Sequence, residues 1–380
     1  MKTSRRQFLA TAAGAVAAPA LLPGVEAVAA PPQLENLGID WGFPEGAVRV
    51  GLNENPLGVS PVAARAMLRA VVHGNRYLRS STLIDKLATL HGVDNDWITF
   101  GCGSTELLMN APWGFAQGGE IVTGREAYRD LPNESQQMGI TTHMVPLDST
   151  LTHDLGAMAN AINDRTRIIN VTNPNNPTGT LVPVQDLRAF AREVPAECVF
   201  LIDEAYIHFA PDEEASDLVH EFDNVLILRT FSKIFGMAGI RVGYAVGHPD
   251  MIGKLRRYGV RNNVNTVGFV GAIAALDDTD HMEKYRNLLR EGKDFYKKEL
   301  DAAGIDHLPS WTPFFLINTH GDGQQVVDAL GEHNVFIRRG VDWDLPTYVR
   351  VTYGTMEENR QVLAALKQVM PEGTVRQGAA

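Results

Sequence analysis

Hydrophobic positions between about residues 97 and 247 fall into short apolar runs separated by longer amphipathic stretches. The short runs are rich in Val, Ile and Phe and too brief for helices, which predicts strands. We expect strands at 97–100, 120–124, 142–147, 167–173, 199–205, 225–230 and 241–247, with helices at 104–116, 154–163 and 184–193. Near-continuous apolar strands alternating with helices predict an α/β fold with a mostly parallel seven-stranded sheet covered on both faces.

The pattern changes toward the C-terminus. One long helix is expected at 267–302, followed by strands at 314–318, 335–339 and 348–354 and helices at 324–332 and 356–369. This order predicts a smaller α+β domain at 263–380, beside a large domain at 66–262. The Pro- and Gly-containing segment 30–65 is expected to pack as an N-terminal arm against the small domain.

The first 29 residues are expected to be an export signal. Arg5 and Arg6 precede a run of small apolar residues and an A-x-A site for cleavage after Ala29. The stretch "SRRQFL" resembles the twin-arginine signal, which predicts a periplasmic or other extracytoplasmic location. The alternative is a disordered alanine-rich tail. The run is too short and too weakly apolar to predict stable membrane anchoring after the signal is removed.

Composition narrows the class of protein. The chain has 380 residues and a net charge of -11, which argues against a nucleic-acid-binding surface. Two cysteines, Cys102 and Cys198, predict no disulfide framework. The histidines lack H-x-x-x-H or similar spacing, so no metal site is expected.

Three stretches combine polar groups with predicted strand ends. The glycine loop "GCGSTE" (101–106) would suit an anion at a helix N-terminus, or would be a tight turn capped by Ser104. "NPNNPTG" (173–179) fixes an irregular turn, which has a purely structural reading as well. In "LIDEAYIHF" (201–209), Asp203 ends an apolar run and needs a cation or donors, unless it is an N-cap or half of a core ion pair.

The fourth stretch, "RTFSKIFGMAGIR" (229–241), places Lys233 among apolar residues, with hydroxyls at Thr230 and Ser232 and a cation at Arg241. Alone, Lys233 could be a surface lysine in a loop. A partly buried lysine beside a second cation is also a candidate nucleophile. The four stretches together supply phosphate donors, a carboxylate for a ring nitrogen and an amine for an aldehyde, which are the groups needed to hold pyridoxal phosphate.

The ordered motifs "LNENPLG", "NRY", "NPNNPTG", "DEAY", "RTFSK", "GMAGIRVGY" and "VRVTYGT" cover most of residues 45–370. With them the chain resembles fold-type I pyridoxal-phosphate aminotransferases of class I/II, and is most similar to the histidinol-phosphate aminotransferase group. The resemblance implies an aminotransferase that works as a homodimer on small-molecule substrates, an amino acid and a 2-oxo acid. A decarboxylase or lyase similar to threonine-phosphate decarboxylase, and a binding protein without turnover, are the alternatives.

The resemblance also implies roles for individual residues. Lys233 matches the lysine that forms a Schiff base with the cofactor and moves the proton, Asp203 the partner of the ring nitrogen, and Tyr206 and Asn176 the donors to the ring oxygen. Arg350 matches the clamp for the substrate α-carboxylate, and Asn176 is also expected to bind the substrate. Arg338 falls close to the position where the histidinol-phosphate group has a second arginine, which binds the substrate's distal phosphate. The remaining matches are the phosphate cradle (Ser104, Thr105, Thr230, Ser232 and Arg241), a ring that stacks on the cofactor (Tyr128), and a tyrosine that reaches the neighbouring subunit's cofactor (Tyr77).

Three departures bear on the substrate. Leu78 follows "RY" where the family has proline, Thr105 stands where an acidic residue is common, and "GREAYRD" around Tyr128 is a loose match. Histidinol phosphate is a cytoplasmic intermediate, whereas the signal predicts export. We therefore expect a free aromatic or dicarboxylic amino acid as donor, a 2-oxo acid as acceptor, and slow turnover of histidinol phosphate.

The export hypothesis has a direct test. Replacing Arg5 and Arg6 with lysine conserves charge but removes the twin-arginine pair, so the protein should remain in the cytoplasm. Cell fractionation and immunoblotting measure this, with Lys2→Arg as the control that should still be exported. Periplasmic appearance of the double variant at the unchanged level would show that another signal is used.

Overall fold

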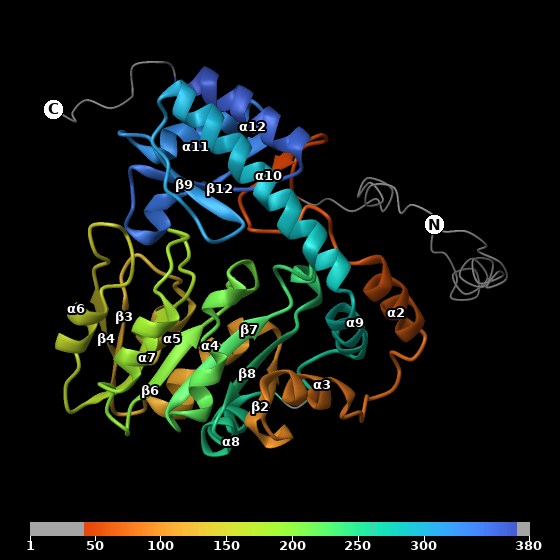
Figure 1. Cartoon of the computed structure of the whole chain (residues 1–380), viewed down its shortest axis with the longest axis vertical. Helices are drawn as coiled ribbons and strands as arrows, with labels where there is room; N and C mark the ends of the chain where they lie inside the picture. Colours follow the sequence, from red (N-terminus) through yellow and green to blue (C-terminus); the bar gives the residue numbers. More distant parts are fainter. Residues whose placement is uncertain (1–41, 261, 371–380) are drawn as a thin grey trace, which may run out of the picture. The chain divides into compact units, whose positions relative to one another are not determined.

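In the computed structural model, residues 42–260 and 262–370 are described, so the predicted signal at 1–29 lies outside the described residues. A seven-stranded sheet has the order β2-β8-β7-β6-β5-β3-β4 (Figure 1). Six strands share one direction and β8 runs opposite, which confirms the mostly parallel sheet. The strands are β2 (Ile98–Gly101), β3 (Glu120–Gly124), β4 (Thr141–Val145), β5 (Thr166–Thr172), β6 (Val199–Asp203), β7 (Val225–Thr230) and β8 (Gly243–Gly247).

Helices cover both faces of this sheet because successive strand side chains point in opposite directions. Ile168 and Leu201 pack with α4, α5 and α8, whereas their neighbours Ile169 and Ile202 pack with α2, α3, α7 and α9. The helices are α2 (Pro61–Val71), α3 (Thr82–His91), α4 (Gly103–Phe115), α5 (Asp130–Gln137), α6 (Leu155–Asn160), α7 (Val184–Ala191), α8 (Pro249–Tyr258) and α9 (Thr266–Asp277). The sheet therefore has two separate apolar layers, one on each face.

Short 3₁₀ turns connect several of these elements. They are η2 (Asn95–Trp97), η3 (Ile207–Phe209), η4 (Pro211–Glu213), η5 (Ser216–His220), η6 (Ala238–Ile240) and, later in the chain, η7 (Gly340–Trp343). Two of them, η6 and η7, lie next to the cavity described below.

The C-terminal part forms its own small sheet, ordered β11-β12-β9, with helices beside it. Its elements are α10 (Thr279–Ala303), β9 (Phe314–Asn318), α11 (Gly323–Glu332), β10 (Val335–Phe336), β11 (Arg338–Arg339), β12 (Tyr348–Thr352) and α12 (Met356–Val369). The single strand expected at 335–339 is wrong, because β10 pairs with β1 (Val48–Arg49) and β11 with β12. Val48 and Val50 thus pack against this part of the fold.

The single helix expected at 267–302 is also wrong. Asp278 leaves the helical conformation at φ -95° and ψ 67°, and its side chain accepts a hydrogen bond from His281 N at 3.2 Å. It therefore caps α10 and separates it from α9. Ala272 of α9 and Tyr285 of α10 pack in the core on one face of the large sheet, whereas Leu289 and Leu300 pack in the C-terminal core. The domain boundary expected at residues 262/263 stays a prediction, and these cores meet along α10.

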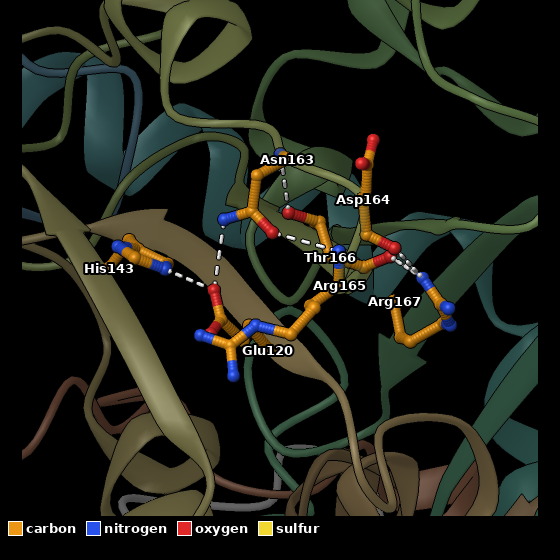
Figure 2. Close-up of polar contacts among 7 residues, drawn as sticks. All are labelled: Glu120, His143, Asn163, Asp164, Arg165, Thr166 and Arg167. Atoms are coloured by element: carbon orange, nitrogen blue, oxygen red, sulfur yellow. Dashed lines mark hydrogen bonds and ion pairs between the residues drawn. The ribbon is translucent and has the colours of Figure 1, made fainter.

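A buried carboxylate links the N-terminal ends of neighbouring parallel strands. Glu120 opens β3, and its Oε2 lies 2.7 Å from His143 Nε2 and 2.9 Å from Asn163 Nδ2. Figure 2 shows Arg165 reaching the same carboxylate, with which it forms an ion pair. Hydrogen bonds from His143 and Asn163 lower the pKa of Glu120. The cluster joins β3, β4 and the turn before β5 at the edge opposite the cavity.

Two further observations concern the cysteines and the search for membrane-spanning helices. Cys102 is exposed and Cys198 is buried, and both are free thiols. None of the helices within 42–260 and 262–370 combines the length and apolarity needed to cross a membrane.

Candidate active site

A cavity of about 740 Å³ lies at the carboxyl ends of the parallel strands, within the size range of small-molecule sites. Its walls come from strand ends of the large sheet, from the turn at 52–53 and from η7 and β12. The lining residues are Leu52, Asn53, Ser104, Thr105, Tyr128, Arg129, Asp130, Asn133, Thr172, Asn176, Asp203, Ala205, Tyr206, Thr230, Ser232, Lys233, Ala238, Arg241, Arg338, Asp342, Trp343, Asp344 and Arg350.

One end of the cavity is an anion cradle at the N-terminus of α4. Ser104 and Thr105 lie in the first turn, where backbone N–H groups and the helix dipole favour negative charge. Gly103 has φ +73°, and a Cβ there would lie 2.3 Å from Arg241 Nη2. A Cβ on Gly243 would lie 2.2 Å from Ser104 N. Both glycines are therefore needed for the close approach of helix, strand and guanidinium.

The Arg241 side chain is held in this cradle by neutral oxygens. Its Nη1 donates to Ala238 O at 3.0 Å and Ser232 Oγ at 3.4 Å, and its Nη2 donates to Cys102 O at 3.3 Å. Thr230 Oγ1 donates in turn to Ser232 Oγ at 2.9 Å. No carboxylate among these partners cancels the cation, so the cradle keeps its positive charge for an anion.

Lys233 follows directly after this hydroxyl pair and is half-buried. Its Nζ donates to Asn53 O at 3.4 Å and lies 5.5 Å from the centre of the Tyr206 ring. Lys233 therefore lines the same cavity as the cradle and the strand-end carboxylate of β6. This placement is the one expected of a group that bonds an aldehyde.

Asp203 is the carboxylate at the end of β6 and is almost completely buried. Its Oδ1 accepts a long hydrogen bond of 3.2 Å from Ala205 N, the one donor to this carboxylate within the described residues. Burial raises the pKa of Asp203 to about 7, because little in its surroundings favours the charged form. A protonated ring nitrogen placed against it would satisfy the carboxylate.

A buried ion pair supports the strand ends behind Asp203. Arg229 of β7 lies 2.7 Å from Glu204 Oε2, and both side chains are buried. Its Nη2 also reaches Glu214 Oε2 at 3.1 Å. The Glu204 carboxylate raises the pKa of Arg229, so the guanidinium stays charged. Because Glu204 follows Asp203 and Arg229 precedes Thr230, the pair fixes both strands where they enter the cavity.

Tyr206 is positioned by a residue from the N-terminal segment. Asn53 Nδ2 donates to Tyr206 Oη at 2.9 Å, which leaves the hydroxyl proton for a ligand. Asn53 is itself held by Thr352, which accepts from its backbone N at 3.0 Å and donates to its Oδ1 at 3.1 Å. Residues almost 300 positions apart thus set the tyrosine's orientation.

Arg350 of β12 is buried and lies between two aromatic rings, 4.7 Å from Trp343 and 5.1 Å from Phe314. Its Nη1 donates to Asn176 Oδ1 at 2.5 Å and its Nη2 to Gly51 O at 2.7 Å. Its Nε is buried without a partner in the described part of the chain. Burial lowers the pKa of Arg350 to about 10. A ligand carboxylate is the group that would complete this site.

Arg338 is the register partner of Arg350 in the antiparallel pair β11–β12. Sequence reasoning put the two arginines twelve residues apart, and the strand pairing brings them opposite each other. Arg338 Nε lies 2.9 Å from Asp342 Oδ2, within the same small segment. Arg338 is thus an exposed cation that already has a carboxylate partner.

Tyr128 lies in the cavity wall before α5, as expected. Its hydroxyl donates to Asp130 Oδ2 at 2.6 Å, and burial together with that carboxylate raises the pKa of Tyr128. The neighbouring Arg129 forms an ion pair with Asp344 of the C-terminal part at 2.7 Å. The loose "GREAYRD" match therefore contributes two carboxylate contacts that the resemblance did not suggest.

Of the residues singled out from the sequence, only Tyr77 does not line this cavity; it is exposed by 81%. The others are brought together, and their individual roles stay predictions. The sequence reasoning missed Asn53, although it lies in the quoted "LNENPLG" motif, and it missed Asp342, Trp343 and Asp344, for which no local signal exists. Within the described residues, no group of three or more His, Cys, Asp or Glu side chains is placed to hold a metal ion.

These groups fit pyridoxal phosphate. The cradle supplies a helix N-terminus and a cation without a carboxylate partner, and Asp203 is a buried carboxylate in need of a positive partner. Thr172 Oγ1, another cavity-lining atom, is also buried without a partner in the described ranges. Such unsatisfied polar atoms indicate that a polar ligand belongs in the cavity.

Comparisons with known proteins agree with this chemistry. Residues 46–366 match the family model for aminotransferase class I and II. The chain is 35% identical to histidinol-phosphate aminotransferase of Caldicellulosiruptor saccharolyticus, over 86% of this chain and 92% of that protein. It is 34% identical to histidinol-phosphate aminotransferase 1 of Nitrosococcus oceani, over 89% and 93%. The crystal structure of histidinol-phosphate aminotransferase from Sinorhizobium meliloti in complex with pyridoxal-5'-phosphate superposes with a TM-score of 0.79, at 27% identity, covering 85% of this chain and 90% of that one.

The raised pKa of Asp203 makes a prediction for the cofactor-free protein. Burial raises the pKa of this carboxyl from its ordinary value of 3.8 to about 7 in the folded chain, so folding favours the protonated acid. The stability it contributes is complete below about pH 4 and is lost as the pH rises through 7. Asp203→Asn removes this titration, so the variant should gain stability relative to the wild type between pH 5 and pH 8, by about 3 kcal/mol at most.

Urea unfolding of both cofactor-free proteins at the two pH values measures the difference. Asp212→Asn, an exposed aspartate outside the cavity, is the matched control and should show no such trend. A stability difference between Asp203→Asn and wild type that does not change with pH would contradict the raised pKa.

Proposed function

The chain belongs to the class I and II aminotransferase family and is a pyridoxal-phosphate-dependent aminotransferase, and from this premise we propose that its donor is a free aromatic or dicarboxylic amino acid and its acceptor a 2-oxo acid. The observation that carries the proposal is the difference between two facing arginines. Arg350 is buried with an unsatisfied Nε, whereas Arg338 is paired with Asp342. Arg350 therefore offers a strong site for the donor's α-carboxylate, whereas Arg338 offers a weaker site for the donor's side chain.

Different residues of the chain bind the cofactor, bind the substrate and transfer the proton. Pyridoxal phosphate, when bound, supplies an aldehyde that takes the amino group and a protonated ring that withdraws electrons. Asp203 would hold the proton on the ring nitrogen, and the cradle around Arg241 would hold the phosphate. Arg350 would bind and orient the substrate α-carboxylate. Lys233 Nζ would take the proton from the substrate α-carbon and deliver it to the cofactor carbon that carried the aldehyde.

Donor choice is where this proposal departs from the relatives' names. Those relatives are histidinol-phosphate aminotransferases, which favours a phosphorylated donor. The proposed export signal argues the other way, because a protein sent out of the cytoplasm leaves that intermediate behind. The Asp342 carboxylate beside Arg338 argues in the same direction, since it offsets the charge that a distal phosphate would need.

The experiment measures the half-reaction in which the donor gives its amino group to the cofactor. Purified holoenzyme is mixed with phenylalanine, glutamate or histidinol phosphate without an acceptor, and the visible absorbance of the bound cofactor is followed to give an efficiency for each donor. We expect phenylalanine or glutamate to exceed histidinol phosphate. Lys233→Ala should fold but lose both the absorbance band and turnover, and Lys254→Ala is its matched control. Carbon dioxide release, measured in parallel, should be absent.

The donor proposal fails if histidinol phosphate is at least a hundredfold more efficient than both free amino acids, roughly 2.7 kcal/mol of transition-state binding, and Arg338→Ala removes that advantage.

The proposed assembly is a homodimer. The outer face of α2 and the turn after it carry exposed apolar side chains, with Leu68 exposed by 72%, Val72 by 76% and Tyr77 by 81%. Such a strip suits an interface with a second copy of the chain. Burial of Tyr77 there would let its hydroxyl reach the cofactor phosphate of the other subunit.

Light scattering of the holoenzyme should therefore give twice the mass of one chain. Tyr77→Phe should weaken cofactor binding, measured by equilibrium dialysis, whereas Tyr258→Phe, which changes another partly exposed tyrosine, should not. A fully active monomer would rule the assembly out.

A further inference from the structure

The rim of the cavity consists of Arg129, Arg338, Asp342, Trp343 and Asp344, and it is electrically balanced. Arg338 Nε lies 2.9 Å from Asp342 Oδ2, and Arg129 Nη2 lies 2.7 Å from Asp344 Oδ2. Each rim arginine thus has a carboxylate partner, although such exposed pairs are individually weak. These five residues together carry no net charge, and Arg339, which shares Asp342, is not among the residues that line the cavity.

We propose that Asp342 is a specificity-determining residue that makes the rim prefer uncharged aromatic donors over donors with an anionic side chain. The proposal rests on the function proposed above and narrows its donor class. A carboxylate or phosphate at the end of a donor would need the Arg338 guanidinium, and Asp342 already occupies it. Discrimination of this kind works through a repulsive group as much as an attractive one.

Local geometry fixes Asp342 in this position. The 3₁₀ turn η7 begins directly after Arg339 and returns the chain, so Asp342 stands four residues from Arg338 and three from Arg339. Its Oδ1 accepts from Arg339 Nε at 2.8 Å while Oδ2 faces Arg338. With 21% of its side chain exposed, the carboxylate is more enclosed than either arginine.

The remaining rim chemistry also suits an aromatic ring. Trp343 is buried, with the Arg350 guanidinium 4.7 Å and the Arg338 guanidinium 5.8 Å from its ring centre. A flat guanidinium and an indole present faces on which an aromatic side chain can stack. Asp130, which accepts from the Tyr128 hydroxyl, adds a further negative charge to the same wall. The cavity lining therefore contains carboxylates at Asp130 and Asp342 that would repel an anionic side chain.

A purely structural role for Asp342 is the competing explanation. Arg338 and Arg350 are register partners, and like charges directly opposite on paired strands repel. Asp342 could therefore serve only to offset this repulsion. That role predicts a less stable protein with unchanged donor preference, so the two explanations differ in what a substitution does to the ratio of efficiencies.

The test uses the holoenzyme and the half-reaction described above. Asp342→Asn should raise the efficiency on glutamate, and on histidinol phosphate, relative to phenylalanine by about tenfold, or ~1.4 kcal/mol. The gain should require Arg338, so Arg338→Gln should erase it in the Asp342→Asn background while changing the wild-type ratio less. Asp212→Asn removes the same charge outside the cavity and should leave the ratio unchanged.

Binding of unreactive analogues gives a second readout. Succinate should bind Asp342→Asn more tightly than wild type relative to 3-phenylpropionate, as measured by the perturbation of the cofactor's absorbance. If Asp342→Asn is too unstable to purify, Asp342→Ser removes the same charge. A ratio within twofold of wild type in both readouts would overturn the proposal. The wild-type ratio alone tests the proposed donor, and the change on substitution tests Asp342, so the two failures are distinguishable.

Discussion

The Arg350 guanidinium is the point at which three distant parts of the chain meet. A buried arginine must be surrounded by acceptors, and here these are the Gly51 backbone oxygen and the Asn176 side chain. These two hydrogen bonds hold the N-terminal segment and the asparagine turn in place relative to β12. The same hydrogen bond engages Asn176 Oδ1, which leaves the amide NH₂ as the donor for a ligand. Removal of this cation would abolish the hydrogen bonds to both of these segments.

The cavity keeps its two groups of arginines in different electrostatic states. In the cradle, Arg241 is held by carbonyl and hydroxyl oxygens, which leave its charge available. At the rim, Arg129 and Arg338 are held by carboxylates, which offset theirs. A phosphate group is therefore favoured at one end of the cavity and not at the other.

Structural features that depend on residues close together in the chain could be predicted from the sequence. The strands of the large sheet, the glycine loop and the turn around Asn176 carry short-range signals, and those strands begin and end within about two residues of the expected positions. The break at Asp278 was missed because one capping residue interrupts an otherwise continuous helical pattern. Asp342 and Trp343 could not be found, because their position follows from the pairing of β11 with β12 and from the turn η7. Asn53 lay inside a recognised motif, yet its contact with Tyr206 exists only in the folded chain.

Helix α10 belongs to both hydrophobic cores. Its 25 residues span about 37 Å, and Tyr285 packs with the large sheet while Leu289 and Leu300 pack with the C-terminal strands. Figure 1 shows it running from the neighbourhood of α9 toward α11 and α12. A rigid rod anchored at both ends transmits torque between the bodies it joins. Any displacement of β12 relative to the large sheet would therefore also have to bend or shift this helix.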